Sequence, residues 1–362
     1  MKKLAFVIMI LLLINTITWT SSSKKVVGEI LEVKEIQDIL KNEILKVKII
    51  EGKYNGEIIT IEREVIECSI YDFDLNIGDK ILIELYLNDS DSLCAKFINV
   101  WRVDKIKNLT LIFVISVIIF GGLKGILSIS SLLFSTYIIL KFMVPGILKG
   151  YNIIMVSMLS ALIIIVTSFI LIAGFTKKSL VSMLGTMGGT IIAGLLAYTY
   201  SKLANITGVA DENVMFLITN IGLELDFGNL YMSSILIGSI GAVMDVSMSI
   251  TTSMFEIKKQ SPKITTKNLI QSGFQIGKDI MSTMTNTLIL AYTGSSMPLI
   301  IINVLYDYDF IYAINNEMLA MEIIRSLCCS IGLVMTIPLT VLIAANSIKQ
   351  KNISSRQYRY NK

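Results

Sequence analysis

The chain combines two patterns of apolar and polar residues. Between residues 24 and 107, short runs rich in Val and Ile alternate apolar with polar positions, which is the period of a half-buried β-strand. From residue 108 onward, short charged loops separate apolar runs that are long enough to cross a bilayer, which takes about 20 residues. The two patterns predict a small all-β domain followed by a bundle of membrane-spanning helices.

The β pattern predicts five strands, and turns containing glycine separate several of them. Five strands in so short a segment favour a small OB-like barrel. The strands are expected at residues 26–33, 44–50, 57–63, 80–87 and 93–102.

The apolar runs predict about seven spans, near residues 109–123, 126–145, 152–174, 180–200, 230–254, 282–303 and 323–346. Residues 1–23 have a basic start and an apolar core, so they are either a cleaved signal peptide or a retained signal-anchor helix. We therefore expect four regions. They are the N-terminal segment 1–23, the β domain 24–107, the helical bundle 108–348 and a basic tail 349–362.

Composition agrees with a polytopic membrane protein, since 53% of residues are hydrophobic and the mean hydropathy is +0.69. Lysines gather in alternate loops, as at Lys177, Lys258 and the tail, while the opposite loops carry acidic residues such as Asp211 and Asp307. The positive-inside rule places the basic loops and the tail in the cytoplasm and the β domain outside the cell membrane. The basic excess is confined to loops, so we expect no nucleic-acid partner.

The sequence offers no catalytic centre. It contains no histidine, which excludes Ser-His-Asp triads and histidine-containing zinc sites. We identify no catalytic residue, metal site or cofactor motif, and we expect no enzyme activity. Cys328 and Cys329 lie in an apolar run, whereas Cys68 and Cys94 in the β domain either pair or remain free thiols.

Asp245 is the main candidate for a functional residue. It lies inside an apolar run from about Leu230 to Phe255, where a charge costs at least roughly 2.5–3.5 kcal/mol. At helical spacing Gly238, Gly241 and Ser249 lie on the same face as Asp245. We expect this small, polar face to contact other helices.

A second polar face is expected on the span that follows. Its candidate transport or ion-binding residues are Lys278, Asp279, Thr283 and Asn286. Asn286 is expected at the depth of Asp245, where a contact would make the carboxylate tolerable. Two interpretations of this set remain open: an ion, proton or polar-solute site, or a buried polar network that only fixes helix register.

Close helix packing is expected at four glycines, Gly185, Gly189, Gly238 and Gly241. Residues 214–221 are apolar but too short to cross, so they form either a re-entrant helix or an amphipathic helix packed over the bundle.

The chain resembles the YibE/F-like family of bacterial multi-pass membrane proteins. The resemblance extends over about residues 26–346, and its motifs are Gly121-Gly122-Leu123-Lys124-Gly125, the run from Gly241 to Ile250, and the run from Ser272 to Tyr292. In the β domain the similar residues are Gly52-Lys53-Tyr54-Asn55-Gly56, Tyr71-Asp72 and Gly78-Asp79. The resemblance implies a bacterial cell-membrane location and this architecture, and it implies no established activity.

Two functions are therefore expected as alternatives. The first is a permease or transporter of an unknown small polar solute or ion, with Asp245 as its titratable site. The second is a non-transport envelope or assembly factor whose β domain binds an extracytoplasmic protein, with structural polar residues in the membrane.

Overall fold

The computed structural model describes residues 25–36, 42–64, 75–87 and 93–360. The expected N-terminal signal or anchor segment and Cys68 lie outside these ranges. The chain divides into two compact units, one ending at Gly122 and the other beginning at Leu123. This division falls at Gly122, a kink within the helical run 103–148.

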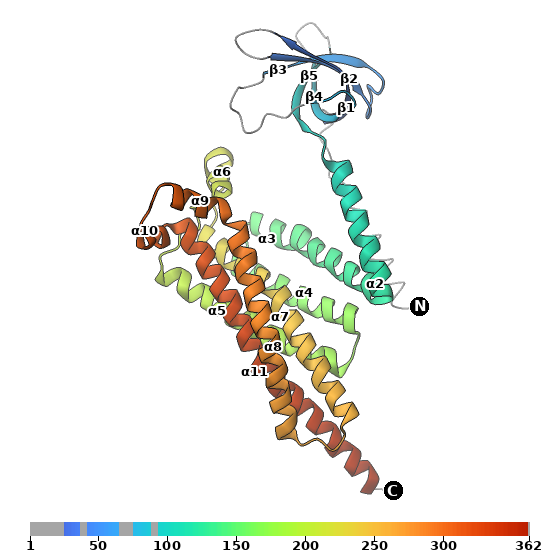
Figure 1. Cartoon of the computed structure of the whole chain (residues 1–362), viewed down its shortest axis with the longest axis vertical. Helices are drawn as coiled ribbons and strands as arrows, with labels where there is room; N and C mark the ends of the chain where they lie inside the picture. The colour runs from blue at the N-terminus through green and yellow to red at the C-terminus, as the bar shows by residue number, and fades with distance from the viewer. Residues whose placement is uncertain (1–24, 37–41, 65–74, 88–92, 361–362) are drawn as a thin grey trace. The chain divides into compact units, whose positions relative to one another are not determined.

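The first unit contains a curled antiparallel sheet of five strands in the order β3-β2-β1-β4-β5 (Figure 1). The strands agree with the predicted ones to within a few residues, because alternating β-branched side chains fix both their period and their extent. Their bounds are β1 Lys25–Ile36, β2 Asn42–Ile49, β3 Ile58–Glu64, β4 Lys80–Leu87 and β5 Leu93–Val100.

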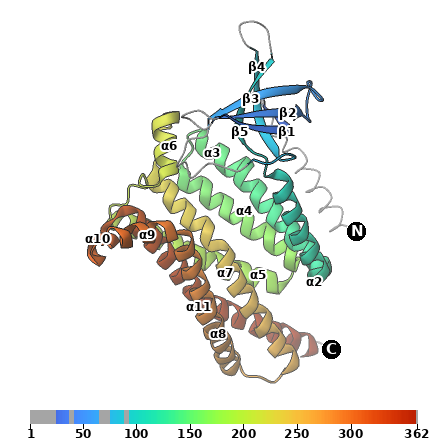
Figure 2. The ribbon, with the colours of Figure 1, turned by 45° about the horizontal axis from the view of Figure 1, so that its top comes forward.

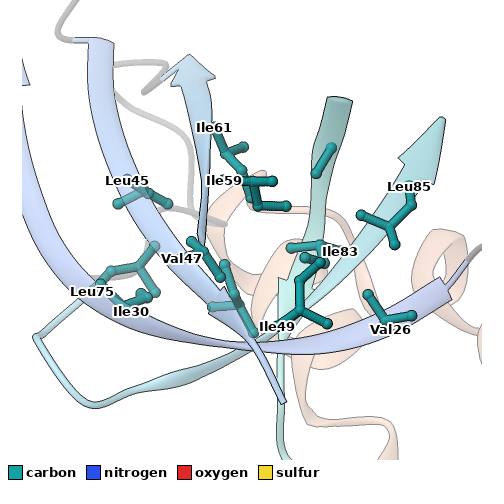
Figure 3. Close-up of a cluster of buried hydrophobic side chains, with 12 residues drawn as sticks. Val26, Ile30, Leu45, Val47, Ile49, Ile59, Ile61, Leu75, Ile83 and Leu85 are labelled. Atoms are coloured by element: carbon teal, nitrogen blue, oxygen red, sulfur yellow. The ribbon is translucent and has the colours of Figure 1, made fainter. Parts of the chain in front are cut away.

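One face of the sheet encloses an apolar core (Figure 3). Ile30, Leu45, Ile81 and Ile83 are completely buried in it. The two edge strands approach each other. The guanidinium of Arg63 on β3 lies 5.2 Å from the ring centroid of Phe97 on β5. Arg63 also forms an ion pair of 3.1 Å with Glu43 on β2. The edge strands therefore meet through a cation–π contact, and the ion pair joins the neighbouring strands β3 and β2.

The second unit is helical and includes a group of long antiparallel helices (Figure 2). Polar residues begin four of these helices as N-caps: the side chains of Asn152, Thr176, Asp226 and Thr265 accept hydrogen bonds from the first turns of α4, α5, α7 and α8. The helices after the sheet are α2 Val103–Ile138, η1 Ile139–Met143 (a π-helical turn), α3 Val144–Leu148, α4 Ile153–Ala173, α5 Lys177–Leu203, α6 Glu212–Ile221, α7 Phe227–Gln260, α8 Thr266–Ser295, α9 Met297–Leu305, α10 Phe310–Asn315 and α11 Glu317–Tyr360.

The seven expected spans correspond to fewer continuous helical runs. In the described part of the chain, five runs are long and apolar enough to cross a membrane, or six if the bent pair α8 and α9 is one span. The first two expected spans lie in one run, 103–148, which consists of two helices joined across a kink at Gly122 (φ 54, ψ −134), close to the predicted boundary between those spans. The expected span 282–303 is broken, because α9 begins with Pro298 in its first turn and is bent by 62° from α8.

Helix α8 also begins earlier than the sequence suggests. Residues 266–281 are polar enough to resemble a loop, but Leu269, Gly273 and Gly277 recur every fourth residue and are buried. A Cβ atom at Gly273 would lie 3.1 Å from Val341 of α11, so this glycine allows close packing of the two helices. The buried stripe therefore extends α8 by four turns.

Candidate functional site

Asp245 lies on an exposed face of α7. Gly238, Gly241, Asp245, Ser249 and Thr252 are all exposed, while residues on the opposite face are buried. Among the described residues no hydrogen bond or ion pair involves the Asp245 carboxylate. The expected face exists. In the described part of the chain its Gly238 lies against Tyr292 of α8, whereas Gly241 has open space beside it.

Two contacts fix the register between α7 and α8. A Cβ atom at Gly238 would lie 3.4 Å from the hydroxyl oxygen of Tyr292, and one at Gly273 would lie 3.2 Å from the methyl carbon of Met254. The two helices run in opposite directions across these contacts. Seven residues after Gly238 on α7 is Asp245, and seven residues before Tyr292 on α8 is Thr285. These two residues are therefore level with each other.

The outward face of α8 is polar over several turns. Its exposed residues are Gln275, Lys278, Asp279, Ser282, Thr283, Asn286, Thr287 and Thr293. The hydroxyls of this set donate to backbone carbonyls of their own helix, as Ser282 does to Asp279 at 2.9 Å and Thr283 to Ile280 at 3.0 Å. The Asn286 amide and the Lys278 ammonium form no hydrogen bond or ion pair within the described part of the chain.

Asn286 is near the depth of Asp245, as the register of α7 and α8 requires. It does not form the expected contact, since no hydrogen bond joins Asp245 to Asn286 or to Lys278 among the residues that the structure describes. Asn286 is exposed on the outward face, whereas Thr285, one position before it, has a buried hydroxyl without a partner. The structure thus places the candidate residues along neighbouring helices without joining them into one bonded cluster.

The buried polar residues of the bundle have a different arrangement. The hydroxyls of Thr186 on α5 and Ser247 on α7 lie 2.6 Å apart and both residues are fully buried. Gly185 and Gly189 face α11 at close range: Cβ atoms there would lie 3.1 Å from Cβ of Thr340 and 3.0 Å from the Gly332 carbonyl oxygen. These residues hold helices together. Gly241, by contrast, has no heavy atom within 4 Å of its Cβ position.

A charged pair that the sequence pattern did not single out lies at the other end of α7. Arg325 on α11 forms an ion pair of 2.9 Å with Glu322, and about a quarter of each side chain is exposed. The Arg325 guanidinium lies 5.4 Å from the ring centroid of Tyr231, whose hydroxyl donates to the Met321 carbonyl. An acid and a base three positions apart at the start of an apolar run were the signal that could have revealed this pair.

Tyr292 lies between this pair and Asp245. Its hydroxyl is 3.6 Å from the Cys329 sulfur, and its oxygen also faces Gly238. On α7 the residues involved recur at seven-residue intervals: Tyr231, Gly238, Asp245 and Thr252. At 1.5 Å per residue this line is about 30 Å long, close to the hydrocarbon thickness of a bilayer. We call these four residues, with the polar face of α8, the polar line.

The comparisons with known proteins agree with the resemblance. The YibE/F-like protein family matches residues 109–350, and the YibE/F family N-terminal domain matches residues 17–100. The chain belongs to the YibE/F-like family. No curated protein and no solved structure matches it.

The family and the apolar helices identify a membrane protein. In this YibE/F-like chain, the described residues contain no group of three or more acidic, histidine or cysteine side chains that could hold a metal ion. Cys94 is a free thiol, and Cys328 and Cys329 are buried free thiols. The polar line offers the carboxylates of Asp245 and Asp279, the amide of Asn286 and several hydroxyl groups.

Proposed function

We propose that the protein is a permease for a small polar solute or an ion, and that its path follows the polar line. The supporting observation is that Asp245, which has no protein partner among the described residues, is exposed on a face made of small and polar residues. A carboxylate at that depth must be protonated, paired or hydrated. A water-filled path along α7 and α8 satisfies this requirement.

The roles of the individual residues follow from their positions. Asp245 carries or releases the coupling proton or binds the cation. Asn286, Thr283 and Ser249 offer neutral hydrogen-bonding groups near its depth. Lys278 and Asp279 lie at the end of the line where α8 is polar throughout, and Glu322 and Arg325 lie at the opposite end.

The same proposal includes an orientation. The loops bearing Lys177, Lys258 and Lys267 face the cytoplasm of a bacterial cell, and the β domain lies outside, by the positive-inside rule. The strand order and the approach of β3 to β5 support an OB-like fold for that domain. We propose a role for the domain in binding an extracytoplasmic protein, and no nucleic-acid partner or enzymatic step.

Water access to position 245 tests the permease proposal. In a variant without its four native cysteines, Asp245→Cys is treated with a membrane-impermeant thiol reagent from the outside and then from the inside of vesicles. Two single-cysteine controls use Ser247, which is fully buried, and Leu342, which is 49% exposed on α11 among apolar residues. Folding of each variant is checked by gel filtration and thermal unfolding.

Reaction at position 245 from at least one side, with both controls inert, is the expected result. An inert position 245 under both treatments overturns the water-filled path. Deleting residues 26–105 then separates the alternatives. An envelope factor loses its cellular phenotype with the bundle still folded, whereas a permease that depends on Asp245 loses the phenotype on Asp245→Asn.

A further inference from the structure

A cavity between α4, α5 and α7 lies apart from the polar line. Its volume is about 320 Å³, and its walls are mostly apolar, with residues such as Ala161, Ile165 and Leu236. These helices pack against one another in the same unit (Figure 2). On α7 the cavity residue Ser233 is turned by about 120° from Asp245, at 100° per residue. The cavity is therefore a separate site.

Three buried hydroxyls line this cavity without any hydrogen-bond partner. They belong to Ser157 on α4, Thr190 on α5 and Ser233 on α7, which are 0%, 4% and 3% exposed. A helical serine usually satisfies its hydroxyl by donating to a carbonyl of the preceding turn, as Ser160 does to Val156 at 2.8 Å. A buried hydroxyl without a partner is costly, so the neighbouring hydroxyls of Ser157 and Ser233 indicate a ligand that accepts hydrogen bonds at their end of the cavity.

The cavity opens toward the lipid-facing surface between α4 and α5. Its lining residues Met158, Leu162, Ile191 and Leu195 are 47–59% exposed. The lining contains no charged side chain. An occupant therefore enters sideways from the membrane, is largely apolar, and carries uncharged acceptor groups where it meets the hydroxyls.

The hydroxyls lie at two depths. Cβ positions at Gly194 and Gly189 on α5 would lie 3.2 Å from Leu236 and 2.9 Å from Val243 on α7, so the two helices are antiparallel with Thr190 near residue 241. Ser233 lies about 12 Å further toward the end of the bundle where α7 begins, at 1.5 Å per residue. Ser157 lies near the same end, in the first turns of α4. The cavity is therefore elongated along the helices, with two hydroxyls at its outer end.

We propose that this cavity binds one acyl chain of a diester membrane lipid, with an ester carbonyl accepting hydrogen bonds from Ser157 and Ser233. An acyl chain lies parallel to the helices in a bilayer, and its ester group lies at the edge of the hydrocarbon region. Ser233 lies two residues after Tyr231, where the polar line of about bilayer thickness begins, so we expect both hydroxyls at that edge. Thr190 lies at the inner end of the cavity, where the acyl chain offers no hydrogen-bond acceptor.

The test uses the full-length protein in nanodiscs of phosphatidylcholine. They contain a small fraction of a phosphatidylcholine with a photoactivatable diazirine in one acyl chain, in either the diester or the diether form. Cross-linked peptides are located by mass spectrometry. The diester probe is expected to label the cavity walls on α4, α5 and α7, and the diether probe, which lacks carbonyl acceptors, about fivefold less.

Variants complete the test. The double variant Ser157→Ala, Ser233→Ala should lower diester labelling of the cavity at least fivefold, while Ser160→Ala, a buried serine outside the lining, leaves it unchanged. Thr190→Val should not lower labelling. Ala161→Phe fills the cavity and Met158→Trp covers its opening, so both variants should abolish labelling of the cavity walls. Because the Met158 side chain is half exposed, Met158→Trp should fold even if Ala161→Phe does not.

Equal labelling by the two probes overturns the assignment. So does labelling that spreads over all apolar helix faces, or labelling that neither the double serine variant nor Met158→Trp reduces. A loss of labelling in Thr190→Val, with full labelling in the double serine variant, would place the ester group at the Thr190 end of the cavity. That result also overturns the assignment.

Discussion

The hydroxyl of Tyr292 on α8 lies directly over Gly238 on α7, 3.4 Å from the position that a Cβ atom would occupy. This contact fixes the register between the two helices that form the polar line. It also connects the line to α11, because the same hydroxyl approaches the sulfur of Cys329. The contact therefore joins three helices near the charged pair Glu322 and Arg325.

The first prediction concerns this contact. Gly238→Ala should leave the stability unchanged within about 0.5 kcal/mol, because 3.4 Å is an ordinary contact. Gly238→Leu should cost roughly 1–3 kcal/mol by displacing Tyr292. Unfolding in mixed micelles by titration with SDS measures both. Adding Tyr292→Ala to Gly238→Leu should recover part of the loss, and purely additive costs would show that the two side chains do not meet.

Two other glycines provide a matched pair. Gly189→Ala places a methyl group against the Thr336 hydroxyl and 3.0 Å from the Gly332 carbonyl oxygen of α11, and 2.9 Å from Val243 of α7, so α5 must move away from both helices. We expect a loss of about 1–3 kcal/mol in the same SDS titration. Gly241→Ala meets open space and should change the free energy of unfolding by less than about 0.5 kcal/mol. A reversed order of the two variants would contradict the observed helix packing.

A third prediction separates bonded from unbonded serines on α7. Ser247→Ala removes the 2.6 Å hydrogen bond to Thr186 and leaves that buried threonine without its partner. We expect a loss of about 0.6–1.5 kcal/mol. Ser249→Ala removes an exposed hydroxyl and should be neutral. If the two variants unfold alike, the buried contact contributes no more than an exposed serine.

The charged pair on α11 should behave as a unit. Arg325→Gln leaves Glu322 partly buried without its cation, and Glu322→Gln leaves Arg325 without its anion. The losses of the two single variants should add up to more than the loss of the double variant. The difference, the coupling free energy, should be about 0.5–3 kcal/mol. A double-mutant cycle by SDS unfolding measures it. A coupling near zero would mean that the ion pair does not persist in solution.

The β domain carries a pH-dependent group. Ion pairs to Lys46 at 2.7 Å and Lys34 at 3.1 Å hold the pKa of Glu32 below its ordinary value of 4.5, and the hydrogen bond from Lys46 is the larger cause. A carboxylate with a lowered pKa adds stability above the pKa of the unfolded chain. That contribution is lost as the pH falls through the lowered folded value.

Lys46→Gln should therefore raise the pKa of Glu32 toward 4.5, and Lys48→Gln, on the same exposed face of β2, should not. The carboxyl ¹³C shift of Glu32, followed by NMR in the full-length protein labelled at glutamate, reports the titration. An identical titration of Glu32 in both variants would show that the cross-strand ion pair has no effect.

The sequence predicted the β strands well and the polar helices less well, for physical reasons. Alternation of buried and exposed positions is a local property, and the five strands follow it. The early start of α8 depends on Gly273 and Gly277 meeting α11, which is a tertiary contact that a polar stretch does not reveal. Pro298 lies in the first turn of α9, but the 62° bend between α8 and α9 depends on the surrounding structure.

The candidate site was also predicted only in part, because local helical spacing is visible in the sequence and tertiary packing is not. The intramembrane position of Asp245 and the depth of Asn286 follow from helical spacing and the order of helices. That Asn286 turns outward while Thr285 faces inward depends on how α8 is rotated about its axis, which only its packing on α11 determines. Arg325 was overlooked because a single charge hardly changes the mean hydropathy of a long apolar run.

The seven-residue spacing of Tyr231, Gly238, Asp245 and Thr252 has a consequence for shape. Positions seven apart on a straight α-helix drift by about 20° per repeat, so the polar line winds slowly around α7 as a left-handed seam. A neighbouring helix that crosses at about 20° follows such a seam along its whole length. Inserting one residue in α7 between Tyr231 and Asp245 would rotate one half of the seam by about 100° relative to the other. The continuity of the polar groups therefore depends on the number of residues between them along α7, and not on any single side chain.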